Sequence, residues 1–376
     1  MNILHYLEMR GDLTFAERPF NEVDNLIFAS LAYLEMKDIV PQDFIFEVSL
    51  KSLCKRYLEL GNDQSYVLND PKILLRKIIS CKRFERVRVG GYFHYVSQDD
   101  QVQFSCMTFM LGDGTAYVGF CGTDDTLAGW REDFNFIFMA STPGQDEAVA
   151  YIERLCARTA CPLRLGGHSK GGNFAMYGAA FCDEHLRDSR IIEIYSNDGP
   201  GFRRQVTDSE QYRAILDRTL KLIPDSSIVG IMLSGREKTK IVRSTAKGIS
   251  QHGFYTWRVR RDRFEEAGKL SFYSTFLDET VRLWMDSLED EQKESFVTAV
   301  FDAIEASGAT TLTELNANKW VSYNAILKAA SQINPEVQGD IFNSLVKLAE
   351  AGRDALWNEA KKAFERFDPA KTADEE

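Results

Sequence analysis

The chain has 376 residues, 44% of them hydrophobic and 27% charged, with a formal net charge of −11 at pH 7. These fractions are typical of a globular protein that buries a substantial core. The acidic balance argues against a nucleic-acid binder, because neutralising phosphates requires a basic surface. No stretch approaches the roughly 18 consecutive apolar residues of a membrane span, and the N-terminus lacks a signal-peptide pattern. We expect a cytoplasmic protein without a transmembrane segment.

The seven cysteines form no C-x-x-C pair, so the sequence indicates neither a disulfide framework nor a zinc site. We therefore expect no metal and no cofactor. Residues 1–85 read as mainly helical, and in 20–34 the apolar Val23, Ile27 and Leu31 recur at helical spacing. Residues 86–123 instead alternate apolar and polar side chains around two turn signals, which predicts a three-stranded antiparallel meander.

Helical and strand patterns then alternate along the chain. In order they are a helix over 144–158, a buried strand at 162–167, a helix after Ser169, a strand and turn over 190–202, and strands at 226–233 and 239–244. Such alternation predicts a mainly parallel sheet covered by helices, an α/β fold.

Beyond about residue 270 only amphipathic helical patterns remain. Val281, Trp284, Met285 and Leu288 share one helical face, and a further helix is expected around 341–367, with Ile341, Leu345, Leu348 and Leu356 on one face. The predicted organisation is a helical segment 1–85, an α/β core 86–262, a helical region 263–368 and a frayed tail 369–376. We expect the C-terminal helices to pack on the core or form a homo-oligomer, more than to cover a site as a lid.

A candidate catalytic turn lies between the strand at 162–167 and the helix that follows it. Gly167-His168-Ser169-Lys170-Gly171 fits G-x-S-x-G, in which a serine occupies a tight turn between a strand and a helix. The predicted strand and helix supply that context. A serine hydroxyl is a weak nucleophile at neutral pH, so Ser169 needs a base, an acid that orients the base, and donors for an oxyanion.

His252 is the best-placed of the five histidines to serve as the base. In α/β-hydrolases the order along the chain is serine, acid, histidine. His5 and His94 precede the serine, His168 lies within the turn and should point away, and His185 closes the following helix. His252 follows the last predicted strand, on a loop that can return over the site.

Two aspartates lie between Ser169 and His252 at predicted strand boundaries. Asp225 is the preferred acid, because the strand and loop between it and His252 allow both to return to one edge of the sheet. Asp198, directly after the strand at 190–197, is the alternative acid, or else a structural residue of a Pro-Gly turn.

Together with GHSKGG (167–172), the upstream stretch GFCGTDDTLAGWREDF (119–134) resembles the class 3 lipase branch of the α/β-hydrolase superfamily. That resemblance spans about residues 100–255. Residues 1–260 are still more similar to a group of uncharacterised bacterial proteins with a lipase-like core. The resemblance implies Ser169 as nucleophile, His252 as base, Asp225 as acid, and an oxyanion hole made by the backbone N–H groups of Thr123 and Lys170.

The chain departs from the lipases directly after the serine, where Lys170 replaces the usual apolar residue. This predicts a cation near the mouth of the site and favours a small or acidic acyl substrate over a triglyceride. The stretch Trp130–Asp133 is interpreted as packing and loop structure rather than chemistry.

The function that these features favour is a serine hydrolase of the lipase or esterase type, acting on a small-molecule or lipid-like ester through an acyl-enzyme. An acyltransferase or peptidase would use the same triad. A binding or scaffold protein that keeps the fold without turnover is the alternative from another class, and a complete triad is what distinguishes the two.

Overall fold

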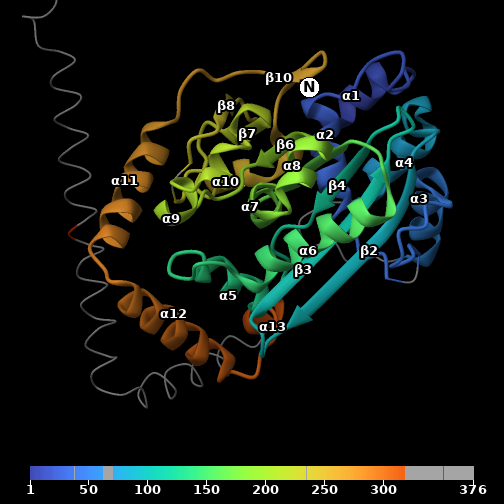
Figure 1. Ribbon diagram of the computed structural model, residues 1–376. Coiled ribbons are helices and arrows are strands. Elements are labelled where there is room, and N and C mark those ends of the chain that lie inside the picture. Colours follow the sequence, from blue (N-terminus) through green and yellow to red (C-terminus); the bar gives the residue numbers. More distant parts are fainter. Residues whose placement is uncertain (38, 62–70, 234, 318–349, 351–376) are drawn as a thin grey trace, which may run out of the picture.

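The structure is a computed structural model that describes residues 1–37, 39–61, 71–233, 235–317 and 350. Its centre is an eight-stranded sheet in which the strands lie side by side in chain order (Figure 1). The strands are β1 (Val48–Ser49), β2 (Arg88–Ser97), β3 (Val102–Met110), β4 (Ala116–Phe120), β5 (Leu163–His168), β6 (Ile191–Asn197), β7 (Thr219–Pro224) and β8 (Lys238–Val242). Strands β1 to β4 pair antiparallel and β4 to β8 pair parallel. The predicted meander and the predicted α/β fold class are confirmed.

Alternation along the strands divides the core between the two faces of the sheet. In β3, Met107 and Phe109 belong to one buried cluster, whereas Phe104 and Cys106 belong to the other. This is the period of two expected of a strand buried on both sides. Each face therefore needs its own cover of helices.

Helices from the N-terminal segment cover the first face. They are α1 (Ile3–Arg10), α2 (Glu22–Leu31), α3 (Leu50–Leu60) and α4 (Pro71–Ser80). The second face is covered mainly by α6 (Pro143–Arg158) and α7 (Lys170–Phe181). Helix α6 begins with a capping box between Thr142 and Gln145 and has Pro143 in its first turn, which fixes its start.

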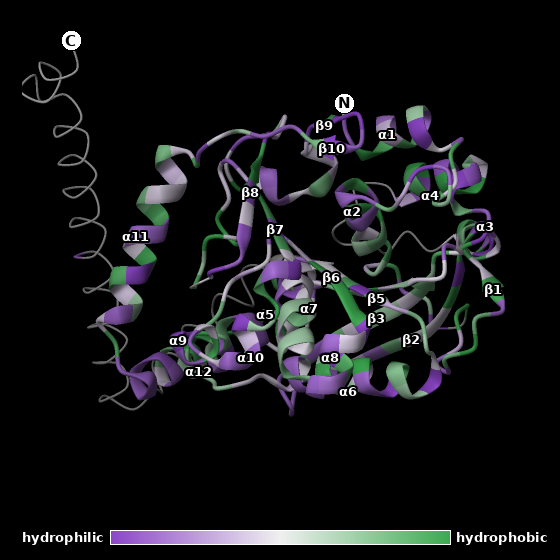
Figure 2. Cartoon of the chain, turned by 45° about the horizontal axis from the view of Figure 1, so that its top comes forward, coloured by the Kyte–Doolittle hydropathy of each residue, from purple (hydrophilic) through white to green (hydrophobic). Residues whose placement is uncertain are grey.

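The remaining helices lie around the carboxyl ends of the parallel strands and along the connections between them. They are α5 (Leu127–Asn135), α8 (Glu184–Arg190), α9 (Arg204–Thr207), α10 (Glu210–Arg213), α11 (Phe272–Asp286), α12 (Asp290–Glu305) and α13 (Leu312–Ala317). In both views α11 and α12 lie on the side of the molecule away from α3 and α4, and polar and apolar residues alternate along them (Figure 2). The helix expected around 341–367 and the tail 369–376 fall outside the described residues. Within the described chain, no helix combines the length and hydropathy needed to cross a membrane.

One predicted strand was wrong. Residues 226–233 form turns, and the strand before them is β7 at Thr219–Pro224. Pro224 ends β7, and the Ser227 side chain then folds back to donate a hydrogen bond to Asp198. The segment is apolar like a buried strand, but Ile228, Ile231, Met232 and Leu233 line a cavity instead of pairing in the sheet.

Candidate active site

Ser169 occupies a strained turn between β5 and α7. Its backbone has φ 57° and ψ −133°, a conformation that non-glycine residues rarely adopt and that costs about 1 to 3 kcal/mol. The turn is held by hydrogen bonds from Ser169 N to Asn197 O (2.9 Å) and from Gly172 N to Ser169 O (2.9 Å). The strand-turn-helix context predicted for the G-x-S-x-G sequence is present.

The glycines on either side of Ser169 allow the first turn of α7 to pack directly against the backbone of the sheet. A Cβ at Gly171 would lie 2.2 Å from the Phe120 carbonyl oxygen, and one at Gly167 would lie 2.2 Å from the Gly171 carbonyl carbon. Neither position has room for a side chain. The glycines of the motif therefore bring the N-terminus of α7 beside the end of β4.

The histidine and one aspartate of the predicted site are in contact. His252 Nδ1 lies 2.7 Å from Asp198 Oδ2. The other oxygen of Asp198 accepts hydrogen bonds from Ser227 Oγ and Gly230 N, and the carboxylate is fully buried. Because a carboxylate only accepts, Nδ1 carries a proton, and Nε2 is left available as a base.

Asp198 is thus the carboxylate that contacts His252, whereas the sequence favoured Asp225. Asp225 follows β7 directly, but its side chain contacts the Ser226 hydroxyl, at 3.3 Å. Its carbonyl oxygen accepts a hydrogen bond from Ser271 N and so fastens the start of α11. Asp198 itself has φ 51°, so the backbone at the end of β6 turns back toward the loop carrying His252.

His168 packs against the face of His252. The two ring centroids are 4.3 Å apart, and His168 Nε2 lies 2.8 Å from the His252 carbonyl oxygen. A carbonyl only accepts, so the proton of His168 is on Nε2 and the Tyr33 hydroxyl donates to Nδ1 (2.8 Å). Burial, followed by repulsion from His252, holds the pKa of His168 well below its usual value. His168 therefore remains neutral and positions the backbone of His252.

The loop after β4 lies beside the serine turn. A Cβ at Gly122 would be 2.5 Å from the His168 carbonyl oxygen, which measures how closely the two segments approach. Within the described chain, the backbone N–H groups of Thr123 and Lys170 donate to no other residue. Ser169 Oγ and His252 Nε2 form no hydrogen bond with each other or with any other group of the described chain.

Lys170 differs from its sequence-based interpretation. Its side chain is fully buried and lies 3.0 Å from Glu132 Oε2, so it presents no cation at the mouth of the site. Glu132 also accepts hydrogen bonds from Gly144 N and Gln103 N. Burial lowers the pKa of the ammonium, but attraction to Glu132 and Asp133 outweighs it, so the pKa lies above its usual value. The expected preference for acidic substrates loses its basis.

Glu132 and Asp133 lie in helix α5 and not in the loop expected for Trp130–Asp133, and their contacts with Lys170 and Thr123 were not foreseen from sequence. They are adjacent in α5, and while Glu132 binds Lys170, Asp133 accepts a hydrogen bond from the Thr123 hydroxyl. One signal was available: a lysine at the start of a helix as small and apolar as GGNFAMYG needs a buried carboxylate partner. The stretch WREDF supplies two.

Replacing Asp133 by asparagine should change how stability depends on pH. Burial raises the pKa of Asp133 from 3.8 to about 6, so the folded state binds the proton more tightly than the unfolded chain. The protonated Asp133 carboxyl contributes fully to the unfolding free energy of the wild type below pH 3.8, and this contribution is lost as the pH rises through 6. An asparagine at this position still accepts from Thr123 and has no charge to bury. The unfolding free energy of Asp133→Asn relative to wild type should rise by about 2 to 3 kcal/mol between about pH 4 and pH 8.

Urea unfolding at the two pH values measures this difference, and the exposed Asp99→Asn serves as the control. A difference between Asp133→Asn and wild type that does not change with pH over this range would contradict the assignment of a buried, protonatable carboxyl.

Comparison with known proteins places this geometry in context. A family model described as Mbeg1-like matches residues 78–302. A search of curated proteins found no match. Among solved structures, "Crystal structure of M37 lipase" is similar with 12% sequence identity and a TM-score of 0.35, covering 55% of this chain and 68% of the other.

Proposed function

Because the chain belongs to the Mbeg1-like family and carries Ser169, His252 and Asp198 at one edge of its sheet, we propose that it is a serine hydrolase acting on carboxylic esters. The observation that carries the proposal is the His252 Nδ1 to Asp198 Oδ2 hydrogen bond beside a serine in a strained strand-to-helix turn. A G-x-S-x-G sequence alone does not imply this hydrogen bond, because His252 and Asp198 are 54 positions apart in the chain.

In the proposed reaction, His252 Nε2 accepts the proton of the Ser169 hydroxyl as Ser169 Oγ attacks the ester carbonyl carbon. Asp198 holds the imidazole in the tautomer that leaves Nε2 free and stabilises the imidazolium that forms. The protonated His252 then donates to the leaving alcohol. Water attacks the acyl-enzyme with His252 again as base, and the acid product leaves.

The free N–H groups of Thr123 and Lys170 support an oxyanion hole at this position. Asp133 holds the Thr123 side chain and Glu132 holds the Lys170 side chain, so both residues are anchored from a single helix, α5. Donors fixed in this way need little rearrangement as charge develops on the carbonyl oxygen.

Labelling with a fluorophosphonate probe tests the proposal. The purified protein should be labelled covalently, Ser169→Ala should lose all labelling, and Ser189→Ala, at an exposed serine, should keep it. Circular dichroism establishes that the variants are folded. Equal labelling of wild type and Ser169→Ala would refute the assignment of the nucleophile, and no labelling of folded wild type would favour a binding protein. Product analysis in the presence of added alcohols separates hydrolysis from acyl transfer.

A further inference from the structure

A cavity of about 330 Å³ lies beside the loop that follows β4. Its walls also come from the segment after α2 and from strands β2 and β3, and Leu34 and Val96 are among its apolar side chains. Cavities of this size hold small organic molecules. Neither Ser169 nor His252 lines it, so a ligand here binds outside the reacting groups of the proposed hydrolase.

Two carboxylates line this cavity, those of Glu35 and Asp124, and neither forms an ion pair with a residue that the structure describes. Asp124 Oδ1 accepts hydrogen bonds from Thr126 N (2.8 Å) and Thr126 Oγ1 (2.5 Å), which leaves Oδ2 without a donor in the described chain. Among the described residues no lysine or arginine lines the cavity, and the imidazole of His94 stacks on the Tyr92 ring with the centroids 6.3 Å apart. The carboxylates of the lining are therefore open to a ligand.

Gln103 adds an acceptor without a partner to the same lining. Its side chain is buried, and its Oε1 forms no hydrogen bond with any residue of the described chain. A Cβ at Gly129 would lie 3.1 Å from Gln103 Oε1 and 3.3 Å from Asp124 Oδ1, so the two oxygens lie close to one another beside α5. A buried acceptor without a donor is costly, and a ligand that donates a hydrogen bond relieves this cost.

The charges behind the cavity wall do not cancel its negative charge. Lys170 attracts Asp124, but its ammonium is bound to Glu132 (3.0 Å) and does not line the cavity. Asp133 is a third carboxylate that acts on Lys170, and it is ionised above about pH 6. Three carboxylates therefore surround one ammonium, and Glu35 adds a further negative charge at the cavity itself.

We propose that this cavity binds a small organic cation, a primary amine, whose ammonium group donates to Asp124 and to Gln103 Oε1 while its apolar part lies against Leu34 and Val96. An ammonium group has three donors and no acceptor, which suits a lining of unpartnered acceptors. An anion would be repelled by the same carboxylates.

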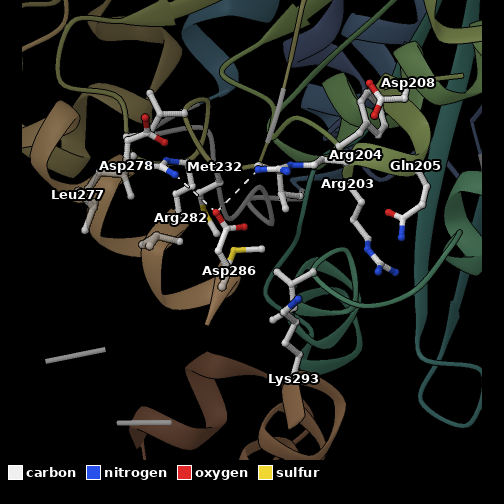
Figure 3. A pocket seen from close by; sticks show the side chains of 17 residues that line it. Arg203, Arg204, Gln205, Asp208, Met232, Leu277, Asp278, Arg282, Asp286 and Lys293 are labelled. Atoms are coloured by element: carbon white, nitrogen blue, oxygen red, sulfur yellow. Dashed lines mark ion pairs between the residues drawn. The ribbon is translucent and has the colours of Figure 1, made fainter. Parts of the chain in front are cut away.

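The larger cavity of about 590 Å³ beside α11 differs in this respect. Arg204 and Arg282 line it, and both pair with Asp286 (Figure 3). Because cations already occupy that lining, an amine should prefer the smaller cavity.

Titrations followed by ligand-observed NMR test the proposal with 2-phenylethylamine, 2-phenylethanol and 3-phenylpropanoate. At pH 8 the amine is protonated, as a lysine is, and should bind at least about tenfold more tightly than the neutral alcohol of similar shape, whereas the carboxylate should bind least. Asp124→Asn keeps an acceptor for Thr126 N and removes the charge, so it should weaken amine binding at least about tenfold. Asp125→Asn, at the adjacent carboxylate outside the lining, is the matched control and should change binding less than about twofold.

Gln103→Leu removes the unpartnered acceptor and should also weaken binding of the amine more than binding of the alcohol. Thermal unfolding establishes which variants are folded, and Glu35→Gln, at an exposed position, takes the place of a variant that is not. Amine binding no tighter than alcohol binding, or amine binding unchanged in the folded lining variants, would overturn the proposal. Equal losses in Asp124→Asn and Asp125→Asn would overturn it as well, since they would show attraction to the surface in general. None of these measurements involves an ester, so their outcome is independent of the proposed hydrolase.

Discussion

Asp198→Asn should reduce kcat for an ester such as p-nitrophenyl acetate by roughly 10⁴-fold while leaving the protein folded. The carbonyl oxygen of the introduced asparagine can still accept from Ser227 and Gly230, so its amide nitrogen is turned toward His252. That nitrogen donates to Nδ1 and forces the proton of the imidazole onto Nε2. With its proton on Nε2, His252 cannot accept the proton of the Ser169 hydroxyl. Asparagine also tolerates the positive φ of this position better than most residues.

Asp225→Asn is the matched control, because both residues follow parallel strands of one sheet, β6 and β7, which are direct neighbours. Among the described residues, its side chain accepts a hydrogen bond from Ser226 and none from His252, so kcat should remain within a few-fold of wild type. Steady-state kinetics with thermal unfolding measures both variants. A larger loss in Asp225→Asn, or equal small losses in the two, would remove Asp198 from the proposed triad.

The second large effect is expected on stability, from Glu132→Ala. This change leaves the fully buried Lys170 ammonium without its partner and removes the acceptor of Gln103 N and Gly144 N. Loss of one member of a buried ion pair costs about 3 to 5 kcal/mol. Urea unfolding should show a loss of this size.

A double-mutant cycle isolates the Lys170–Glu132 pair. Lys170→Met combined with Glu132→Gln removes both charges, and we expect the double variant to lose less stability than the sum of the single changes. Lys82→Met breaks an exposed pair with Glu17 and should have a far smaller effect. Additive losses in the cycle would show that the two side chains do not interact. An altered preference for anionic over neutral esters in Lys170→Met would contradict the burial of the side chain.

Most of the fold was predictable because its elements are encoded locally. The meander of β2 to β4 follows from alternation and turn residues, and α6 from its helical pattern and the acidic residues of its first turn. The error at 226–233 has a physical reason: a run of apolar residues shows that a segment is buried, but it does not distinguish a strand from turns that line a cavity.

The candidate site was predictable in part. Ser169 could be proposed from its turn and His252 from its order in the chain, and the structure places His252 at a carboxylate as that hypothesis requires. The choice between Asp198 and Asp225 could not be made from sequence, because it depends on the backbone turn at Asp198 and on the return path of the loop. The burial of Lys170 was missed for a similar reason: its partner Glu132 is 38 residues away.

The last part of the proposed site to assemble is the loop of His252, which is fastened by the first residues of the chain. Met1 accepts a hydrogen bond from Val259 N, and the Asn2 side chain donates to Tyr255 O, so the first residues of the chain hold the segment next to the base. During synthesis, Ser169 and Asp198 can take their places on β5 and β6 before residues 252–259 exist. At an elongation rate of roughly 5 to 20 residues per second, His252 is synthesised several seconds after Ser169. If Ser169 is the nucleophile as proposed, the nascent chain carries its turn already formed and unable to react.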